Sequence, residues 1–303
     1  MKRLIFIFAI VLMSIYPAAA QENPPLSTDE LKLIDFVLAS YEELFAQTSY
    51  TSELQQSMSQ EITAGFTTIT QDMKQSGSVE AALDPEGGAT NLHAISNQRI
   101  SVDTGDGNPQ AMNNDYELII YDGVMYAKFE NAESLGVPRG WFNLQDLPGM
   151  EMLNLDQFTE LTGANALKVY PINEETVATI EELDSETLEG ETMRVIKITW
   201  DMAALAEMES MSAIFNAEVF SQMLGIDPAE YMRQFALGST YEQILWISTT
   251  DNLPHRADSR MVSDVTIDAM MGSMEMLYEQ TSSATFADFG APVTIEAPEI
   301  GQE

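Results

Sequence analysis

Residues Asp115 to Phe129 have the sequence DYELIIYDGVMYAKF, which predicts a β-hairpin at the centre of the fold. Asp122 and Gly123 form a two-residue turn that accepts positive φ angles, and β-forming residues flank it on both sides. Ile119 and Ile120 point to opposite faces of the first arm, and both are apolar. We therefore expect apolar groups to be covered on both sides of the sheet that contains this hairpin.

Further strands are predicted on both sides of the central hairpin. They cover residues 61–73, 91–102, 176–200 (a second hairpin that turns at 189–190), 241–249, 253–267 and 274–286. Residues 71–88 and 103–114 are rich in turn-forming residues and predict loops, while 141–142 and 289–298 predict short extended segments. The successive hairpins indicate one antiparallel sheet with helical stretches inserted between its strands.

Helices are predicted at three places in the chain. Ser27 and Glu30 have the spacing of a capping box, and an apolar stripe follows it as far as Gln47. Two helical inserts are expected near 147–170 and 201–237, the second capped by Asp201. The predicted fold class is α+β, with a large curved antiparallel sheet (a half-open β-barrel) covered by helices.

The first twenty residues predict a signal peptide. Lys2 and Arg3 precede a short apolar run, and an A-x-A cleavage signal ends at Ala20. The apolar run is too short to span a bilayer comfortably, and no later stretch predicts a transmembrane segment. We expect residues 21–303 to form a single exported domain, periplasmic or secreted. The sequence has no cysteine, so packing alone must hold it together.

The chain is strongly acidic, with 48 acidic and 13 basic residues and a formal net charge of −35. Such a charge repels nucleic acid and anionic membrane surfaces, so neither is an expected partner. A well-solvated surface explains the composition, and the alternative explanation is a cation-rich partner or a saline environment.

Several motifs resemble a known superfamily. The hairpin at 115–129 is followed by Trp141, by VIKITW at 195–200, by ILWISTTDNLPHR at 244–256 and by FADFGAPVTIEAP at 286–298. Together they resemble the bacterial lipoprotein carriers of the LolA/LolB-like superfamily, and most closely the LppX/LprG lipid-binding branch. The resemblance implies a half-open β-barrel whose helices cover a hydrophobic cavity for acyl chains. Unlike many members of that branch, this chain has no N-terminal cysteine, and its helical inserts are larger.

Methionines are the best candidates for lining such a cavity, because their flexible thioether chains adapt to irregular apolar ligands. Filling of a loosely specified core is the alternative role. The predicted lining residues are Met150, Met152, Phe158, Met202, Leu205, Met208, Phe215, Phe220, Met223, Phe235, Met274 and Met276.

No catalytic signature is found, so we expect no enzymatic activity, no cofactor and no metal. The sequence has no GxSxG, HExxH, Walker or GxGxxG motif. His93 and His255 are interpreted as surface residues. The segment 103–108 vaguely resembles a calcium loop but has Gly105 where an acidic or amide ligand is needed.

The predicted function is that of an exported, non-enzymatic carrier for a lipid, lipoprotein or other amphiphile. The alternative is an envelope sensory or protein-interaction module with the same fold, whose partner would be an envelope protein. A hydrolase is a third class, for which the sequence offers no clustered acid–base set.

Overall fold

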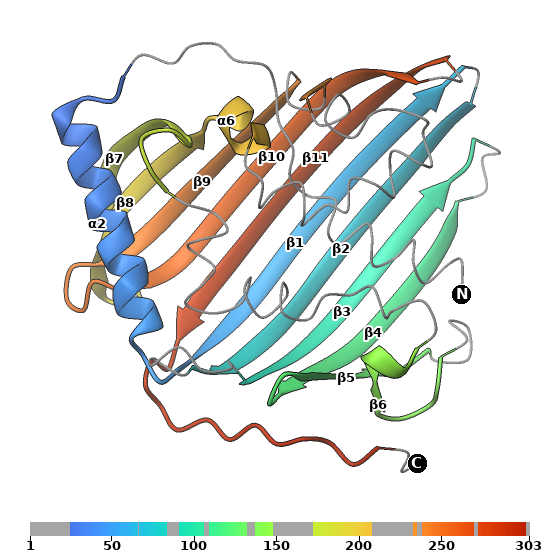
Figure 1. The fold of residues 1–303 in the computed structure, drawn as a ribbon, viewed down its shortest axis with the longest axis horizontal. Helices are drawn as coiled ribbons and strands as arrows, with labels where there is room; N and C mark the ends of the chain where they lie inside the picture. The colour runs from blue at the N-terminus through green and yellow to red at the C-terminus, as the bar shows by residue number, and fades with distance from the viewer. Residues whose placement is uncertain are drawn as a thin grey trace.

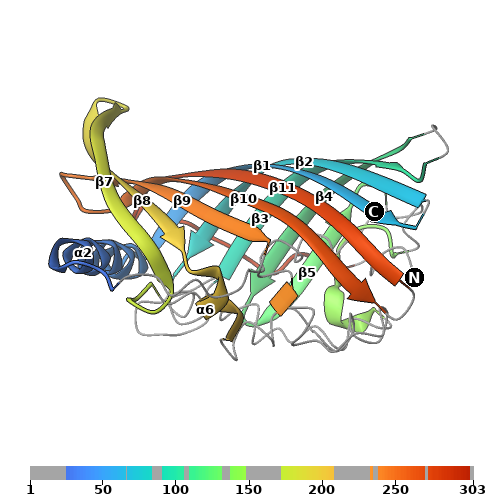
Figure 2. The same ribbon diagram turned by 90° about the horizontal axis from the view of Figure 1, so that it is seen from above.

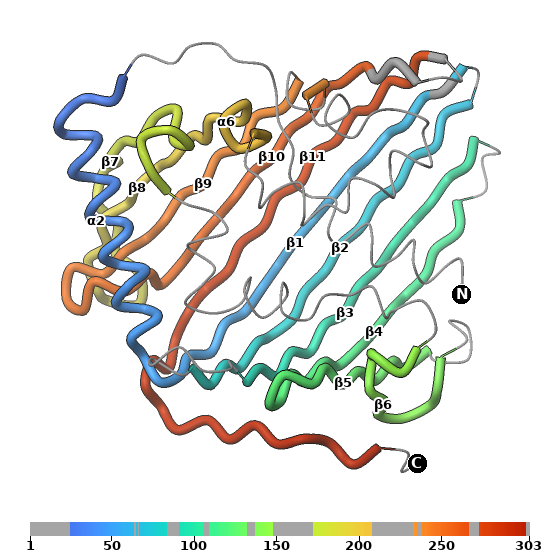
Figure 3. The backbone as a smooth tube through the Cα atoms, in the orientation of Figure 1, coloured from blue at the N-terminus to red at the C-terminus, as the bar shows by residue number. Residues whose placement is uncertain are grey.

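The computed structural model describes residues 25–65, 67–83, 91–105, 109–131, 137–147, 172–207, 233–234, 238–269 and 272–300 (Figures 1 and 3). The predicted signal peptide at 1–20 lies outside these ranges. So do most of the two predicted helical inserts, at 148–171, 208–232 and 235–237.

An antiparallel sheet of eleven strands forms the described part of the chain. Its strands are β1 (Ser49–Ala64), β2 (Thr67–Ala82), β3 (Asn91–Asp103), β4 (Gln110–Tyr121), β5 (Val124–Phe129), β6 (Phe142–Asn143), β7 (Val177–Leu188), β8 (Glu191–Trp200), β9 (Ser239–Ser248), β10 (Pro254–Ala269) and β11 (Gly272–Ala287). The spatial order is β6-β5-β4-β3-β2-β1-β11-β10-β9-β8-β7. Strands that are neighbours in this order are also consecutive along the chain, with one exception. The exception is the pair β1 and β11, which joins the first half of the sheet to the second. The described sheet is open, with β6 and β7 at its edges, and it arches over α6 (Figure 2).

Two described α-helices lie against the inner side of this arch. The helix α2 (Thr28–Phe45) begins with the predicted capping box: the Glu30 N–H donates to Ser27 Oγ (3.3 Å) and the Ser27 N–H donates to Glu30 Oε2 (2.7 Å). The short α6 (Met202–Glu207) begins at the predicted cap, where Asp201 Oδ1 accepts from the backbone N–H groups of Ala203 and Ala204. Among the described residues, the two α-helices cover the end of the sheet near β7–β10 (Figure 1), and a short 3-10 helix, η1 (Leu144–Asp146), packs beside β5 at the other end; this covering is less than the sequence predicts.

The predicted hairpins are confirmed. Asp122 and Gly123 turn between β4 and β5 with φ angles of 49° and 72°, and Glu189 and Gly190 turn between β7 and β8 with 52° and 92°. These positive φ angles are what the two-residue turns require. Ile120 packs in a cluster with Met125, Ala127 and Phe129, and Ile119 on the opposite face is buried too.

The first two strands differ from the prediction. A single strand was expected at 61–73 and a loop at 71–88, but the chain forms two sixteen-residue strands, β1 and β2, that turn at Gly65 with a φ of 62°. Their inward-pointing positions include glutamines, for example Gln56 and Gln75, so the apolar alternation that marks a half-buried strand is broken.

The loop expected at 103–114 is also shorter than predicted, because β4 begins at Gln110. Asn114 looks like a loop residue in the sequence but is a buried strand residue with 5% of its surface exposed. Its side-chain N–H donates to Gln98 Oε1 (3.4 Å), and this partner comes from the neighbouring strand β3. Only the fold supplies such a partner.

Gly77 occupies a tight position in the middle of β2. A Cβ atom at this position would lie 2.3 Å from the carbonyl oxygen of Ile95 in β3. We predict that Gly77→Ala lowers the free energy of unfolding by about 1–3 kcal/mol, since the backbone of an interior strand must shift to accept the methyl group. Urea unfolding followed by circular dichroism measures this change. Ser78→Ala, one residue along on the exposed face, is the control, and equal stability of the two variants would contradict the close approach.

Candidate functional site

The strand register separates two chemically different faces of the sheet. The inner face, on the side of α2 and α6, carries alternate residues of each strand, and the outer face carries the others. On seven adjacent strands (β9, β10 over 256–266, β11, β1, β2, β3 and β4), every charged or histidine side chain that the structure describes occupies an outer position. These outer residues are Glu53, Glu61, Asp72, Lys74, Glu80, His93, Arg99, Asp103, Asp115, Glu117, Glu242, Arg256, Asp258, Arg260, Asp264, Glu275 and Glu279.

The uncharged inner face is banded in rows that run across the strands. We call the first the glutamine row; its members are directly paired from strand to strand: Gln243, Ser259, Ser282, Gln56, Gln75, Gln98 and Asn114. Two residues further along each strand lies the methionine row: Tyr241, Met261, Gln280, Met58, Met73, Ile100 and Met112. Two residues further again lies the serine–glutamine row: Ser239, Ser263, Tyr278, Gln60 and Gln71.

Most members of the methionine row belong to the main apolar cluster. Met58, Met73 and Met261 expose 3%, 1% and 1% of their surfaces. They belong to one contiguous cluster with Ile34 and Val37 of α2. The cluster therefore joins strands from both halves of the sheet to the covering helix, and it is the largest apolar surface on the described inner face.

Hydrogen bonds within the two polar rows are incomplete. The Gln75 side-chain N–H donates to Ser96 Oγ (3.0 Å) and Tyr116 OH (3.3 Å), but its Oε1 atom is buried without a partner in the described structure. The Gln71 Nε2 atom is likewise buried without a partner. The Gln98 Nε2 atom reaches only the sulfur of Met73, at 3.0 Å, and a thioether is a weak acceptor.

The helix α2 is fixed to the inner side by aromatic residues. The guanidinium of Arg194 lies 3.8 Å from the centre of the Phe36 ring, and the same group binds the Glu182 carboxylate through two hydrogen bonds of 2.8 Å. Burial raises the pKa of Tyr41 well above its usual range and also raises that of Tyr241. Both phenols therefore stay neutral, and the helix adds no charge there to the inner face.

The predicted cavity residues fall into two groups. Met202, Leu205 and Met276 are buried in the main apolar cluster, and Met274 packs against it partly buried. The other eight lie outside the described residues: Met150, Met152, Phe158, Met208, Phe215, Phe220, Met223 and Phe235. The prediction of a ligand-binding role stays a prediction for all twelve.

The sequence analysis missed Met58 and Met73 and the glutamines beside them. The methionines of the later half of the chain drew attention because they are numerous, whereas Met58 and Met73 stand alone in polar surroundings. The signal that identifies them is an alternation along the strands. Gln and Met occupy the inner positions, and Ser, Asp and Lys occupy the outer positions. This alternation becomes visible only once the strand register is known.

The outer face carries an open trough of about 910 Å³ across its middle strands. Lys74, Arg99, Asp115 and Arg260 are among its lining residues, and most of the lining points outward by register. Charged and hydrated walls of this kind do not suit an acyl chain. The apolar inner face is therefore the better candidate for a lipid site than this trough.

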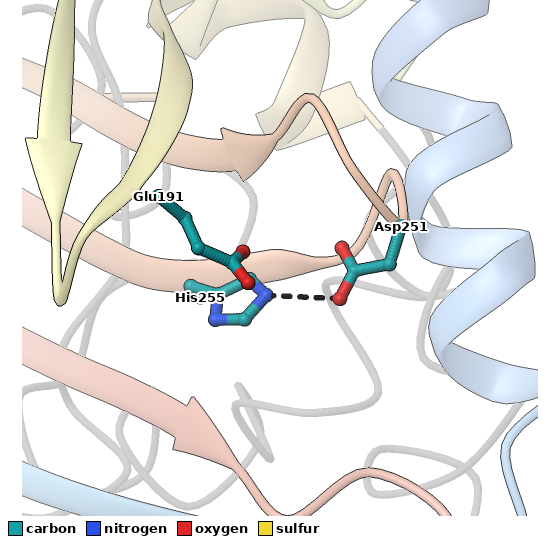
Figure 4. A group of neighbouring side chains, drawn as sticks. All are labelled: Glu191, Asp251 and His255. Carbon is teal, nitrogen blue, oxygen red and sulfur yellow. Dashed lines mark hydrogen bonds and ion pairs between the residues drawn. The ribbon is translucent and has the colours of Figure 1, made fainter.

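Three possible metal ligands meet at one end of the sheet. Glu191 of β8, Asp251 of the β9–β10 turn and His255 of β10 offer ligand atoms within 4.8 Å of one another (Figure 4). His255 Nε2 lies 3.2 Å from Asp251 Oδ2. Partial burial alone would raise the pKa of the Asp251 carboxyl. Hydrogen bonds from the Leu253 N–H and the His255 imidazole outweigh this effect, so the pKa is lowered. The carboxylates are exposed to solvent, where such groups are usually hydrated without a metal.

His255 begins a strand as predicted, and its ring also packs edge-on against Phe289 with centroids 5.2 Å apart. His93 lies on the outer face, with Nε2 2.8 Å from Glu117 Oε1. In the suspected calcium segment, Asp103 Oδ1 accepts from the Gly105 N–H at 2.9 Å, and 106–108 lie outside the described residues. None of these arrangements forms a nucleophile–base pair.

No match to the chain was found among protein-family models or among curated proteins. Among solved structures, the chain is similar to LprF from Mycobacterium bovis, at 13% identity over 91% of this chain and 99% of that chain, with a TM-score of 0.41. It is similar to the lipoprotein LppX from Mycobacterium tuberculosis, at 12% identity over 89% and 100%, with a TM-score of 0.40.

A third similar structure is a putative outer membrane lipoprotein-sorting protein domain from Vibrio parahaemolyticus, at 8% identity over 86% of this chain and 93% of that chain, with a TM-score of 0.23. The matches thus include LppX and a lipoprotein-sorting protein, which the sequence motifs resemble. TM-scores this low carry no functional argument, so the function proposed below rests on this chain's own residues. In the described ranges, no helix is both long and apolar enough to cross a membrane.

The Arg194–Glu182 pair generates a pH prediction. The Arg194 hydrogen bond lowers the pKa of Glu182, so the pair stabilises the fold above the ordinary carboxyl pKa of 4.5 and loses this contribution as the pH falls through the lowered value. We predict that Glu182→Gln destabilises the protein at pH 7 by at most about 1 kcal/mol, because solvent screens the half-exposed carboxylate. The difference from wild type should shrink towards zero well below pH 4.5.

Urea unfolding at pH 7 and at several acidic pH values measures this difference. Glu53→Gln is the control, since it removes the same charge from the exposed outer face of β1 and corrects for the loss of general charge repulsion. A Glu182→Gln effect that stays constant across the whole pH range would contradict the assignment.

Proposed function

We propose that this protein is a non-enzymatic carrier that holds a lipid or another amphiphile against the inner face of its sheet. The observation that carries the proposal is the exclusion of every charged side chain from the inner positions of seven adjacent strands, in a chain with a net charge of −35. An uncharged concave surface of this extent is suited to an apolar ligand. A charged side chain covered by such a ligand would be buried without a partner, at a cost of roughly several kcal/mol.

Burial of apolar surface would supply the binding free energy. Removing apolar area from water gains roughly 25 cal/mol per Å², so an acyl chain that buries a few hundred Å² gains several kcal/mol before association costs. Met58, Met73 and Met261 give the inner face adaptable thioether chains, which repack around ligands of different shape. Met202, Leu205, Met274 and Met276 extend this surface towards α6 and the start of β11.

Half-exposed apolar residues mark where a ligand would enter. Ile69 of β2 and Met112 of β4 occupy inner positions, yet they expose 39% and 40% of their surfaces. Ile69 is paired with Ile62, which packs against the main apolar cluster. A ligand that covers these side chains would extend the buried surface towards that end of the strands.

The proposed cellular setting follows from the sequence. The predicted signal peptide at 1–20 would export the chain to the periplasm or out of the cell, and the acidic outer face would keep it soluble there. The outer charges would also repel anionic bilayers, so the carrier would exchange its ligand without lying flat on a membrane.

Binding of a fluorescent fatty-acyl probe tests the proposal. Wild-type protein should take up the probe with a rise in its fluorescence, and Ile69→Gln should weaken that binding about threefold to tenfold, since it removes part of the apolar contact area. Because Ile69 is only partly covered, the substitution should change stability little, and a urea unfolding curve checks this point.

The matched control is Leu277→Gln. Leu277 is an apolar residue of β11 with 47% of its surface exposed, and it occupies an outer position. It should leave probe binding unchanged. Equal weakening by both substitutions would place the ligand elsewhere. If native mass spectrometry of the protein from its own host shows a clean apo mass and no probe binds, the carrier function is wrong, and the sensory or interaction module becomes the favoured class.

A further inference from the structure

We propose that the inner face selects ligands that carry an uncharged carbonyl group, as in an ester or an amide, and holds that group on Gln71 with the help of neighbouring side chains. This inference rests on the proposed carrier function and names the class of ligand. It predicts that a purely hydrocarbon ligand and a ligand with an ionised carboxylate both bind less well than a neutral acyl ester of the same chain length.

The first step is an account of buried polar atoms. In the described structure, four buried side-chain atoms have no hydrogen-bond partner: Ser40 Oγ, Gln71 Nε2, Gln75 Oε1 and Trp200 Nε1. Gln71, Gln75 and Trp200 all occupy inner positions, and Ser40 is on the buried side of α2. A buried polar group without a hydrogen-bond partner is destabilising, and the outer side of the sheet shows no such atom in the described ranges.

The second step is whether the missing partner would be a hydrogen-bond donor or an acceptor. Gln71 Nε2 and Trp200 Nε1 are hydrogen-bond donors. Two further amide groups of the polar rows, Gln60 Nε2 and Gln98 Nε2, donate only to methionine sulfur, at 3.4 Å and 3.0 Å. Methionine sulfur is a weak acceptor, so the inner face has a surplus of donors. A ligand with an acceptor oxygen completes this set, whereas a hydrocarbon leaves it unpaired.

The third step excludes an ionised acceptor. On the seven central strands, the inner positions contain no lysine, arginine or histidine that could neutralise a carboxylate or phosphate. Arg194, on β8, is already paired with Glu182 through two hydrogen bonds of 2.8 Å. An anion placed next to Gln71 would therefore lose its hydrating water and meet no cation to compensate for that loss. A neutral carbonyl oxygen has no such cost.

The position of Gln71 also fits the proposal. Its side chain is 6% exposed and lies between Gln60 of β1 and Val102 of β3, two residues along β2 from Met73. Apolar side chains of the main cluster therefore lie beside the amide, so that the chain next to a ligand carbonyl could be buried there. Gln75 Oε1 is a buried acceptor without a partner, and it lies four residues further along the same face of β2. It would accept a hydrogen bond from a hydroxyl or N–H of a longer head group.

Displacement of 1,6-diphenylhexatriene, an uncharged hydrocarbon probe, tests the selection. Methyl palmitate, hexadecane and palmitate at pH 8 are compared on the full-length mature protein. Methyl palmitate should displace the probe at a concentration about fivefold to tenfold lower than either of the others. Gln71→Leu should lose most of this preference, while hexadecane displaces the probe from the variant as it does from wild type.

Two further readouts separate a hydrogen bond from a general packing effect. The infrared carbonyl band of ¹³C-labelled methyl palmitate should shift to lower wavenumber in wild type and return towards its value in hydrocarbon in Gln71→Leu. The variant should also unfold at an equal or higher urea concentration, because it removes a buried unpaired amide. Gln55→Leu, at an exposed outer position of β1, is the matched control and should change neither readout.

The outcomes distinguish this inference from the carrier function on which it rests. If none of the three compounds displaces the probe and no labelled ester binds, the carrier function itself fails. If hexadecane or palmitate binds as well as methyl palmitate, the carrier function stands and the carbonyl selection is wrong. An unshifted carbonyl band in wild type overturns it as well. If Gln71→Leu does not fold, Gln60→Leu and the wild-type infrared band decide the question.

Discussion

The alternation of side chains along antiparallel strands is the constraint on which the rest of this structure depends. Because successive residues of a strand point to opposite faces, a shift of one residue in any pairing would move a row of charges to the inside. Asp72 and Lys74 would then replace Met73 between β1 and β3. The pairing of β1 with β11 extends the same alternation across both halves of the chain, so one uncharged surface results instead of two.

The acidic composition and the apolar interior are two consequences of this single arrangement. A net charge of −35 would destabilise a compact fold if the charges met in a medium of low dielectric constant. On the central strands all charges are on the hydrated outer side, where salt and water screen them. The Arg194–Glu182 pair lies at the edge beside α2, and there the guanidinium lies over Phe36 and fixes the covering helix.

The inner face is unusual as a protein core because polar rows lie on both sides of its methionines. A core that served stability alone would satisfy its buried amides or omit them. Here Gln71 and Gln75 each retain an unpartnered buried atom, and Gln98 donates to the sulfur of Met73. Adaptable thioethers between rows of neutral hydrogen-bonding groups form a surface suited to an amphiphile. This arrangement unites the proposed carrier function with the proposed selection of a carbonyl group.

Local chemistry allowed part of this protein to be predicted from its sequence. The turn at Asp122–Gly123 and the capping box at Ser27 depend on residues within four positions, so the central hairpin and α2 follow from the sequence alone. The inner site does not follow from the sequence alone. Its polar residues resemble loop residues, so the sequence pattern does not reveal β1 and β2 as strands with one inward-facing side. Only the tertiary structure decided that Gln56 lies directly beside Ser282, since the pairing of β1 with β11 joins residues more than two hundred positions apart, and no local pattern encodes that register.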